Sequence, residues 1–130
     1  MNICFRLKPG DDLKQKIEDF AIRKKISGIV ASGVGSLNKL KIRLADSKTI
    51  LEKEEAYEIV SLNGTLSPDG VHLHISVADA KGAVTGGHLK DGCIINTTCE
   101  VAIISFDDIK FSRVYDKSTG YEELNVESVL

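Results

Sequence analysis

Apolar residues recur every three or four positions in residues 11–25 of this chain, which predicts one amphipathic helix near the N-terminus. Asp11 and Asp12 stand at its start, where an acidic side chain accepts free backbone N–H groups and suits the helix dipole. The stretch ends on the basic residues 23–25, which have the favourable sign at a helix C-terminus. The following residues no longer keep this spacing, so no second strong helix is expected.

Elsewhere the pattern has a period of two, or is rich in β-branched residues, and both are typical of strands. Strands are expected over residues 2–7, 29–31, 37–46, 57–67, 71–80, 93–106 and 109–116. Between them we expect a bulge or tight turn at 33–35, a polar connection at 47–56, a turn at 67–70, a glycine-rich loop at 81–92 and a C-terminal segment at 117–130.

A single early helix followed by strands joined by turns favours an α+β domain. The expected architecture is a mostly antiparallel β-sheet with one main N-terminal helix packed on it. The 130 residues fit a single domain over residues 1–130, long enough to bury a core without disulfides or structural metals.

Composition narrows the class of protein. Hydrophobic residues make up 42% and charged residues 28%, which is ordinary for a soluble globular domain. We see no signal peptide and no apolar run of membrane-spanning length. The three cysteines include no CxxC pair, so reduced thiols in a cytoplasmic protein are expected.

Charge gives little reason to expect a polyanionic partner. Lys and Arg number 17 against 19 Asp and Glu, a net charge of −2, so no general attraction to DNA or an anionic membrane follows. One local exception is the strand at 37–46, where Lys39, Lys41 and Arg43 share a face. This basic face can contact an anion, or it can simply protect a solvated strand edge.

All three histidines fall between residues 72 and 88. His72 and His74 occupy alternate positions of an expected strand, so they project from the same face about 6.5 Å apart. His88 follows Gly86 and Gly87, which allow the backbone to turn sharply or to approach a neighbouring strand closely. If His88 folds back, three imidazoles meet as in a catalytic zinc site; otherwise they are surface or structural histidines.

Other candidate groups accompany this metal hypothesis. Gly86 and Gly87 would leave room for a small-molecule ligand beside the ion. Glu100 is a candidate general base, and Asp79 a candidate second-shell or proton-handling group. A solvated carboxylate is the alternative interpretation of both.

The motifs taken together resemble the plants-and-prokaryotes-conserved (PPC) domain family over nearly the whole chain. The opening "FRLKPGDDLKQKIEDFA" is similar to the strand-turn-helix start of that family. The pattern "L-x-G-T-L … HLHIS-x-A-D … G-x-x-x-GGHL … G … T-x-E" is the most specific part, and "FSRVYDKSTGYEEL" resembles the closing segment.

The resemblance implies a homotrimer with sites near the subunit boundaries. It also implies that His72, His74 and His88 hold a metal ion, with Zn²⁺ the first choice. DNA binding is associated with plant relatives that carry AT-hooks, whereas the Arg-Gly-Arg-Pro core of an AT-hook is absent from this sequence.

One physical feature also suggests a partner subunit. The run at 95–106 is long and apolar for one strand of a small antiparallel domain, and a strand apolar on both faces needs cover on both. A second subunit would supply that cover, or the helix and C-terminal segment of the same chain would.

Three functions remain open at this point. The first is a metal-binding homotrimer with a metal-dependent small-molecule activity at the three histidines. The second is a DNA-associated or regulatory oligomerisation module without catalysis. The third is a small-ligand sensor that uses the glycine-lined cleft.

Overall fold

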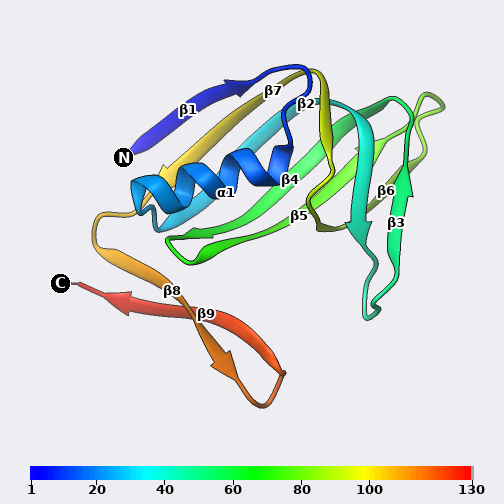
Figure 1. Ribbon diagram of the computed structural model, residues 1–130. Coiled ribbons are helices and arrows are strands. Elements are labelled where there is room, and N and C mark those ends of the chain that lie inside the picture. The colour runs from blue at the N-terminus through cyan, green and yellow to red at the C-terminus, as the bar shows by residue number, and fades with distance from the viewer. Residues whose placement is uncertain (130) are drawn as a thin grey trace.

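The computed structural model describes residues 1–129 and shows one helix and nine strands in that range. Figure 1 shows the helix α1 against a curved sheet, with the last two strands set apart as a hairpin. The elements are β1 Asn2–Leu7, α1 Leu13–Lys24, β2 Gly28–Arg43, β3 Ile50–Lys53, β4 Tyr57–Ser67, β5 Gly70–Ala78, β6 Val84–Leu89, β7 Ile94–Ser105, β8 Ile109–Asp116 and β9 Tyr121–Ser128. This confirms an α+β domain with antiparallel pairing throughout the described sheets.

Helix α1 has the predicted ends. Asp12 is the N-cap and its side chain accepts the backbone N–H of Gln15 at 3.1 Å. Lys25 ends the helix in the left-handed conformation, with its N–H bonded to the carbonyls of the last turn. The apolar stripe is buried against β4 and β5, so the helix packs on the sheet as expected.

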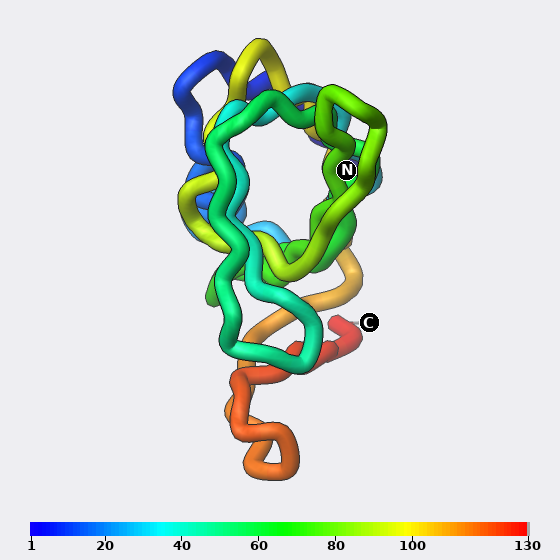
Figure 2. Tube along the Cα trace, turned by 90° about the vertical axis from the view of Figure 1, so that its right-hand side faces the viewer, coloured from blue at the N-terminus to red at the C-terminus, as the bar shows by residue number. Residues whose placement is uncertain are grey.

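Strand β2 organises the sheet because it pairs with four others. Its first half lies between β7 and β4, and its second half pairs with β3 and, at Ile42 and Arg43, with β6. Since β4, β5 and β6 are also consecutive neighbours, the strands β2, β4, β5 and β6 close into a ring. The ring is visible end-on in Figure 2.

Strand β2 is longer than the sequence predicts. Residues 29–31 and 37–46 were expected as separate strands around a bulge or turn at 33–35. Residues 28–43 form one strand, and residues 44–46 lie outside it. The pairing of this strand with β7 shifts register at three places, so the chain bulges there without leaving the strand. A Cβ on Gly35 would lie 2.0 Å from the Thr98 carbonyl oxygen, so glycine allows close approach to β7 there.

Three further segments were assigned too little structure. The polar connection at 47–56 contains β3, the glycine-rich loop at 81–92 contains β6, and the C-terminal segment contains β9. Each is short or poor in buried residues, so local pattern gave no strand signal. All three become strands because a neighbouring strand offers them hydrogen bonds.

The run at 95–106 is β7, and only one of its faces is well buried. Ile95, Cys99, Val101 and Ile103 are at most 2% exposed, whereas Ile104 on the other face is 38% exposed. The chain therefore leaves part of the outer face of β7 uncovered.

Within residues 1–129, no helix is long and apolar enough to cross a membrane.

Candidate metal centre

The three histidines lie on the outer face of the strand ring. His74 on β5 is directly opposite His88 on β6, and His72 is two residues before His74. The same cross-strand row continues to Asn63 on β4 and to Arg43 at the end of β2. Because opposed residues of antiparallel strands share a face, the register of four strands brings these side chains together.

The imidazole rings converge closely. Nε2 of His72 is 3.2 Å from Nε2 of His74, and one ring nitrogen from each histidine lies within 4.8 Å of the others. The ring centroid of His88 is 5.2 Å from that of His72 and 5.7 Å from that of His74. The convergence expected from the sequence is therefore present, while metal binding by these residues stays a prediction.

His88 is the most enclosed of the three. Its Nδ1 atom is buried and has no hydrogen-bond partner within residues 1–129. Burial, followed by the proximity of His72 and Arg43, lowers the pKa of His88 to about 4. The pKa of His72 is also lowered, by burial and then by His74. Both rings are therefore neutral at pH 7, the form in which imidazole binds a metal.

Gly86 and Gly87 serve the packing of β6. A Cβ on Gly86 would lie 2.4 Å from the carbonyl oxygen of Ile75 on β5. A Cβ on Gly87 would lie 2.5 Å from the carbonyl oxygen of Arg43 on β2. The glycines therefore let β6 fit between β5 and β2, which places His88. Neither of them lines the cavities beside the histidines, so the expected space for a ligand comes from other residues.

The two candidate carboxylates lie elsewhere. Glu100 is exposed on β7, where its neighbours are Arg6 on β1 and Val34 on β2, and it lines neither cavity at the histidines. Asp79 closes the β5–β6 turn, where its Oδ1 accepts two backbone N–H groups at 2.9 Å. Within one chain, the structure brings neither carboxylate to the three histidines.

A cavity of about 300 Å³ lies next to His72 and His88. Its wall combines charged residues from the ring, from α1 and from the β8–β9 hairpin. The charged residues are Glu18, Arg43, Asp69, Arg113, Glu122 and Glu123. The sequence places Arg43 on a basic face and Arg113 in the closing family motif. It does not predict either as a site residue, because only the packing of β8 on β4 brings Arg113 to the histidines.

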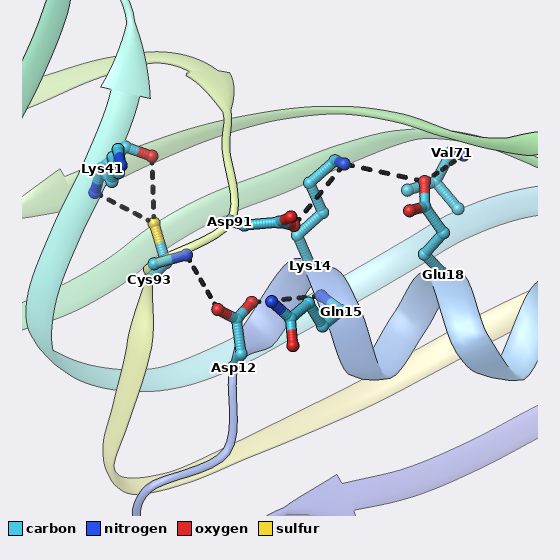
Figure 3. A network of polar contacts seen from close by, with 9 residues as sticks. Asp12, Lys14, Gln15, Glu18, Lys41, Val71, Asp91 and Cys93 are labelled. Atoms are coloured by element: carbon cyan, nitrogen blue, oxygen red, sulfur yellow. Dashed lines mark hydrogen bonds and ion pairs between the residues drawn. The ribbon is translucent and has the colours of Figure 1, made fainter.

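Helix α1 fixes the start of β5 through a side-chain contact. Oε2 of Glu18 accepts the backbone N–H of Val71 at 3.2 Å, one residue before His72. Lys14 bridges Glu18 and Asp91, with both N–O distances 3.6 Å (Figure 3). The helix is thereby tied to β5 and to the β6–β7 connection. In the sequence, these two contact points come just before His72 and just after His88.

A second set of contacts holds the end of β2. Sγ of Cys93 accepts the backbone N–H of Lys41 at 3.2 Å and donates to its carbonyl at 3.3 Å. Oδ2 of Asp12, at the helix N-terminus, accepts the N–H of Gly92 at 2.8 Å. Figure 3 shows that these groups form one network between the helix and the sheet. Arg43 lies two residues beyond Lys41, so this network also places the last member of the histidine row.

Comparison with known proteins identifies the family. The model of the Plants and Prokaryotes Conserved (PCC) domain, the family called PPC above, matches residues 2–107. The chain belongs to the PCC domain family. The PCC domain covers most of the chain, including all three histidines, and confirms the resemblance drawn from the motifs.

Three similar proteins illustrate the setting of this PCC domain. "Bifunctional protein GlmU" of Synechococcus sp. (strain JA-3-3Ab) is 49% identical over 95% of this chain, which spans 20% of that protein's length. A hypothetical protein of Salmonella is 33% identical, with a TM-score of 0.94, and the match covers 100% of this chain and 95% of that one. The metal-containing protein AF0104 of Archaeoglobus fulgidus is 28% identical, with a TM-score of 0.77 over 96% of this chain and 93% of that one.

Proposed function

We propose that His72, His74 and His88 bind one divalent transition-metal ion, with Zn²⁺ the first choice. The observation that carries this proposal is the convergence of three imidazoles, with one ring nitrogen of each within 4.8 Å of the others. Nδ1 of His88 is also buried without a hydrogen-bond partner in residues 1–129, and a cation bound to that atom would remove the cost of burying it. A solved relative described as metal-containing supports the same conclusion.

The spacing of one ligand pair suits a tetrahedral ion. Two nitrogens bound to tetrahedral zinc at about 2.0–2.1 Å lie about 3.3 Å apart, and Nε2 of His72 is 3.2 Å from Nε2 of His74. Three neutral imidazoles with one open position form the ligand set of many catalytic zinc sites. Histidine and the borderline-soft metals also match in chemistry, whereas Mg²⁺ and Ca²⁺ prefer oxygen ligands.

We infer that the site acts on or binds a small molecule in the adjacent cavity. A zinc ion held there would polarise a bound group and lower the pKa of a bound water. The residues of the chain would hold the imidazoles in register and orient the ligand against the charged wall. Glu100 has no part in this proposal because it lies on β7, outside the cavity.

Metal content and mutation test the site. Full-length protein purified without a histidine tag should contain about one equivalent of zinc by elemental analysis. His88→Ala should weaken metal binding more than about 100-fold, because even changes to residues behind the ligands cost 10–100-fold. Asn63→Ala is the matched control, since it removes a polar side chain from the same row without removing an imidazole.

Two results would contradict the metal proposal. One is wild-type protein that takes up no zinc, cobalt or nickel when these are supplied. The other is a His88→Ala variant that binds the metal as tightly as the Asn63→Ala control.

We also propose that the chain assembles as a homotrimer, the number of subunits following from the resemblance to the PPC family. Support comes from apolar side chains that the single chain leaves uncovered. On the β8–β9 hairpin, Val114 is 53% and Val126 57% exposed, and Ile104 on β7 is 38% exposed. The hairpin stands apart from the ring in both views (Figures 1 and 2), where a second subunit can reach it.

Light scattering tests the assembly. The expected mass is about three times the 14.1 kDa of one chain. Val114→Glu should reduce it, because a charge would be buried in an apolar contact. Ile22→Glu on α1, a residue 47% exposed and outside the hairpin, is the control. A wild-type mass of one chain, or equal masses for Val114→Glu and wild type, would contradict the proposal.

A further inference from the structure

Two arginines flank the histidines without carboxylate partners. Nη1 of Arg43 donates to the carbonyls of Leu44 at 3.4 Å and Ser47 at 3.0 Å. Nη2 of Arg113 donates to Oγ1 of Thr65 at 2.9 Å. In residues 1–129, neither guanidinium lies within ion-pair distance of a carboxylate. Each guanidinium has five N–H donors, so both keep donors available for an anion in the cavity.

The arginines approach from two different parts of the molecule. Arg43 is opposite His88 at the end of β2, so its position follows from the register of the ring. Arg113 is on β8, and its backbone N–H donates to Oδ2 of Asp69 in the β4–β5 turn at 3.0 Å. Its partner Thr65 is opposite His72 on β5, which places the guanidinium beside that histidine. Both arginines are half-buried, which strengthens their interaction with an anion relative to a solvated side chain.

The acidic residues of the wall limit the charge of the ligand. Glu18 and Asp69 each accept a backbone N–H, whereas Glu122 and Glu123 are exposed on β9 at the rim. Two arginines against four carboxylates leave the wall with a net charge of −2, which a divalent cation at the histidines would neutralise. A monoanion therefore fits better than a phosphate dianion. The rim carboxylates also favour a ligand with hydroxyl groups, which would donate hydrogen bonds to them.

Volume limits the size of the ligand. The cavity of about 300 Å³ is at the lower end of the range for ligand pockets, so it suits a small molecule. We propose that this cavity binds a small hydroxylated monocarboxylate, with its carboxylate paired to Arg43 and Arg113 and its hydroxyl groups toward Glu122 and Glu123. This inference rests on the proposed metal site, because the cation supplies the charge balance.

Glycerate is a suitable probe, with glyceramide as its uncharged counterpart and inorganic phosphate as the dianion. Titrations of the full-length, zinc-loaded protein would be followed by calorimetry and by NMR. Glycerate should bind more tightly than phosphate, and glyceramide should bind at least about tenfold more weakly than glycerate, since a charge-assisted hydrogen bond contributes about 1.5–3 kcal/mol. The shifted amide signals should lie at the end of β2, in β8 and in β9, the strands that carry the proposed contact residues.

Arg113→Gln should weaken glycerate binding about tenfold or more while the zinc content stays unchanged. Arg43→Lys, which keeps the charge but loses the planar fork, should weaken it less. Arg6→Gln is the matched control, because Arg6 also donates to a threonine hydroxyl, Oγ1 of Thr98 at 2.8 Å, but does so on β1. Its glycerate affinity should equal that of the wild type.

The outcomes separate this inference from the metal proposal. Zinc-loaded protein that does not bind glycerate, or binds glyceramide or phosphate as tightly, overturns the carboxylate assignment while leaving the metal site intact. Equal glycerate affinity in Arg113→Gln, Arg6→Gln and wild type overturns the role of the arginines. Failure to load zinc overturns the metal site itself and, with it, the charge balance on which this inference rests.

Discussion

The strand ring and the β8–β9 hairpin are both antiparallel structures, yet they bury their apolar side chains to different extents. On β5 of the ring, Leu73, Ile75 and Val77 are 1%, 3% and 0% exposed. On the hairpin, Val114 and Val126 are more than half exposed. Packing within one chain therefore holds the three imidazoles, whereas the hairpin depends on contacts beyond its own two strands for comparable support.

The cavity lies between these two regions and takes residues from each. His72, His88 and Arg43 belong to the ring, while Arg113 belongs to the hairpin. The difference indicates a division of tasks. The ring would fix a metal through strand register, and the hairpin would supply part of the ligand wall through an element that a ligand or another subunit can stabilise.

The largest effect is expected from removing a core side chain beneath the histidines. Leu73 lies between His72 and His74 and points inward, so Leu73→Ala should lower the free energy of unfolding by about 2–5 kcal/mol. Val126→Ala on the hairpin should change it by no more than about 0.5 kcal/mol in the monomer. Urea unfolding of zinc-free protein, at a concentration where it is monomeric, measures both. Equal losses would show that the hairpin is as well packed as the ring.

A second prediction concerns acid stability of the metal-free protein. The pKa of His88 is about 4 in the folded chain, below its ordinary value of 6.5, because burial disfavours the charged ring. The folded state therefore resists protonation of this ring. The contribution of His88 to the free energy of unfolding is fully present above pH 6.5 and is lost as the pH falls through 4. Unfolding curves between pH 7 and 4 should show this decline. His88→Gln should reduce the slope, and an unchanged slope would assign the decline to other groups.

The thiols provide a smaller test of how well the ring is packed. Burial raises the pKa of Cys93 and of Cys99 to about 11, whereas Cys4 is exposed. At pH 8 a thiol reagent should modify Cys4 quickly and the other two only after unfolding, because the thiolate is the reactive form. The two buried thiols lose their protons at a higher pH in the folded state than in the unfolded chain. The free energy of unfolding should therefore also fall as the pH rises from 9 to 11. Rapid modification of three thiols in folded protein would contradict this.

The smallest effect is expected at Glu100. Because this residue is exposed on β7 and lines neither cavity at the histidines, Glu100→Gln should leave zinc content and glycerate affinity unchanged. Elemental analysis and calorimetry on this variant, beside Arg113→Gln, measure the difference. A loss of either property would mean that another copy of the chain brings Glu100 to the site.

Local sequence pattern predicted those parts of the fold whose signals lie within one segment. The helix, its caps and the turn at 67–70 follow from spacing and turn chemistry, and the shared face of His72 and His74 follows from strand periodicity. The position of β6 does not follow from such local signals, because a pair of glycines, Gly86 and Gly87, is typical of a loop when the sequence is read alone. They are strand residues because two neighbouring backbones approach them within a distance that a Cβ would prevent.

The sequence predicted the three histidines that converge, but it did not predict the residues around them. Three histidines in one stretch could be proposed as a set, but Arg113 reaches them only through contacts of β8 with Thr65 and Asp69. These contacts join residues more than forty positions apart, and no local periodicity encodes such a pairing. The same limit explains why Glu100 was proposed: a carboxylate can be found in a sequence, but its distance from the histidines cannot.

The interleaving of site and core on β6 has an evolutionary consequence. His88 faces outward and Leu89, the next residue, is fully buried. A single-residue insertion or deletion within this strand would exchange the two, placing an imidazole in the hydrophobic interior and a leucine on the outer face beside the other histidines. Descendants of this chain can thus lose the histidine through a point substitution with the fold intact. Length changes would accumulate instead in the turn before Val84, where they leave the alternation undisturbed.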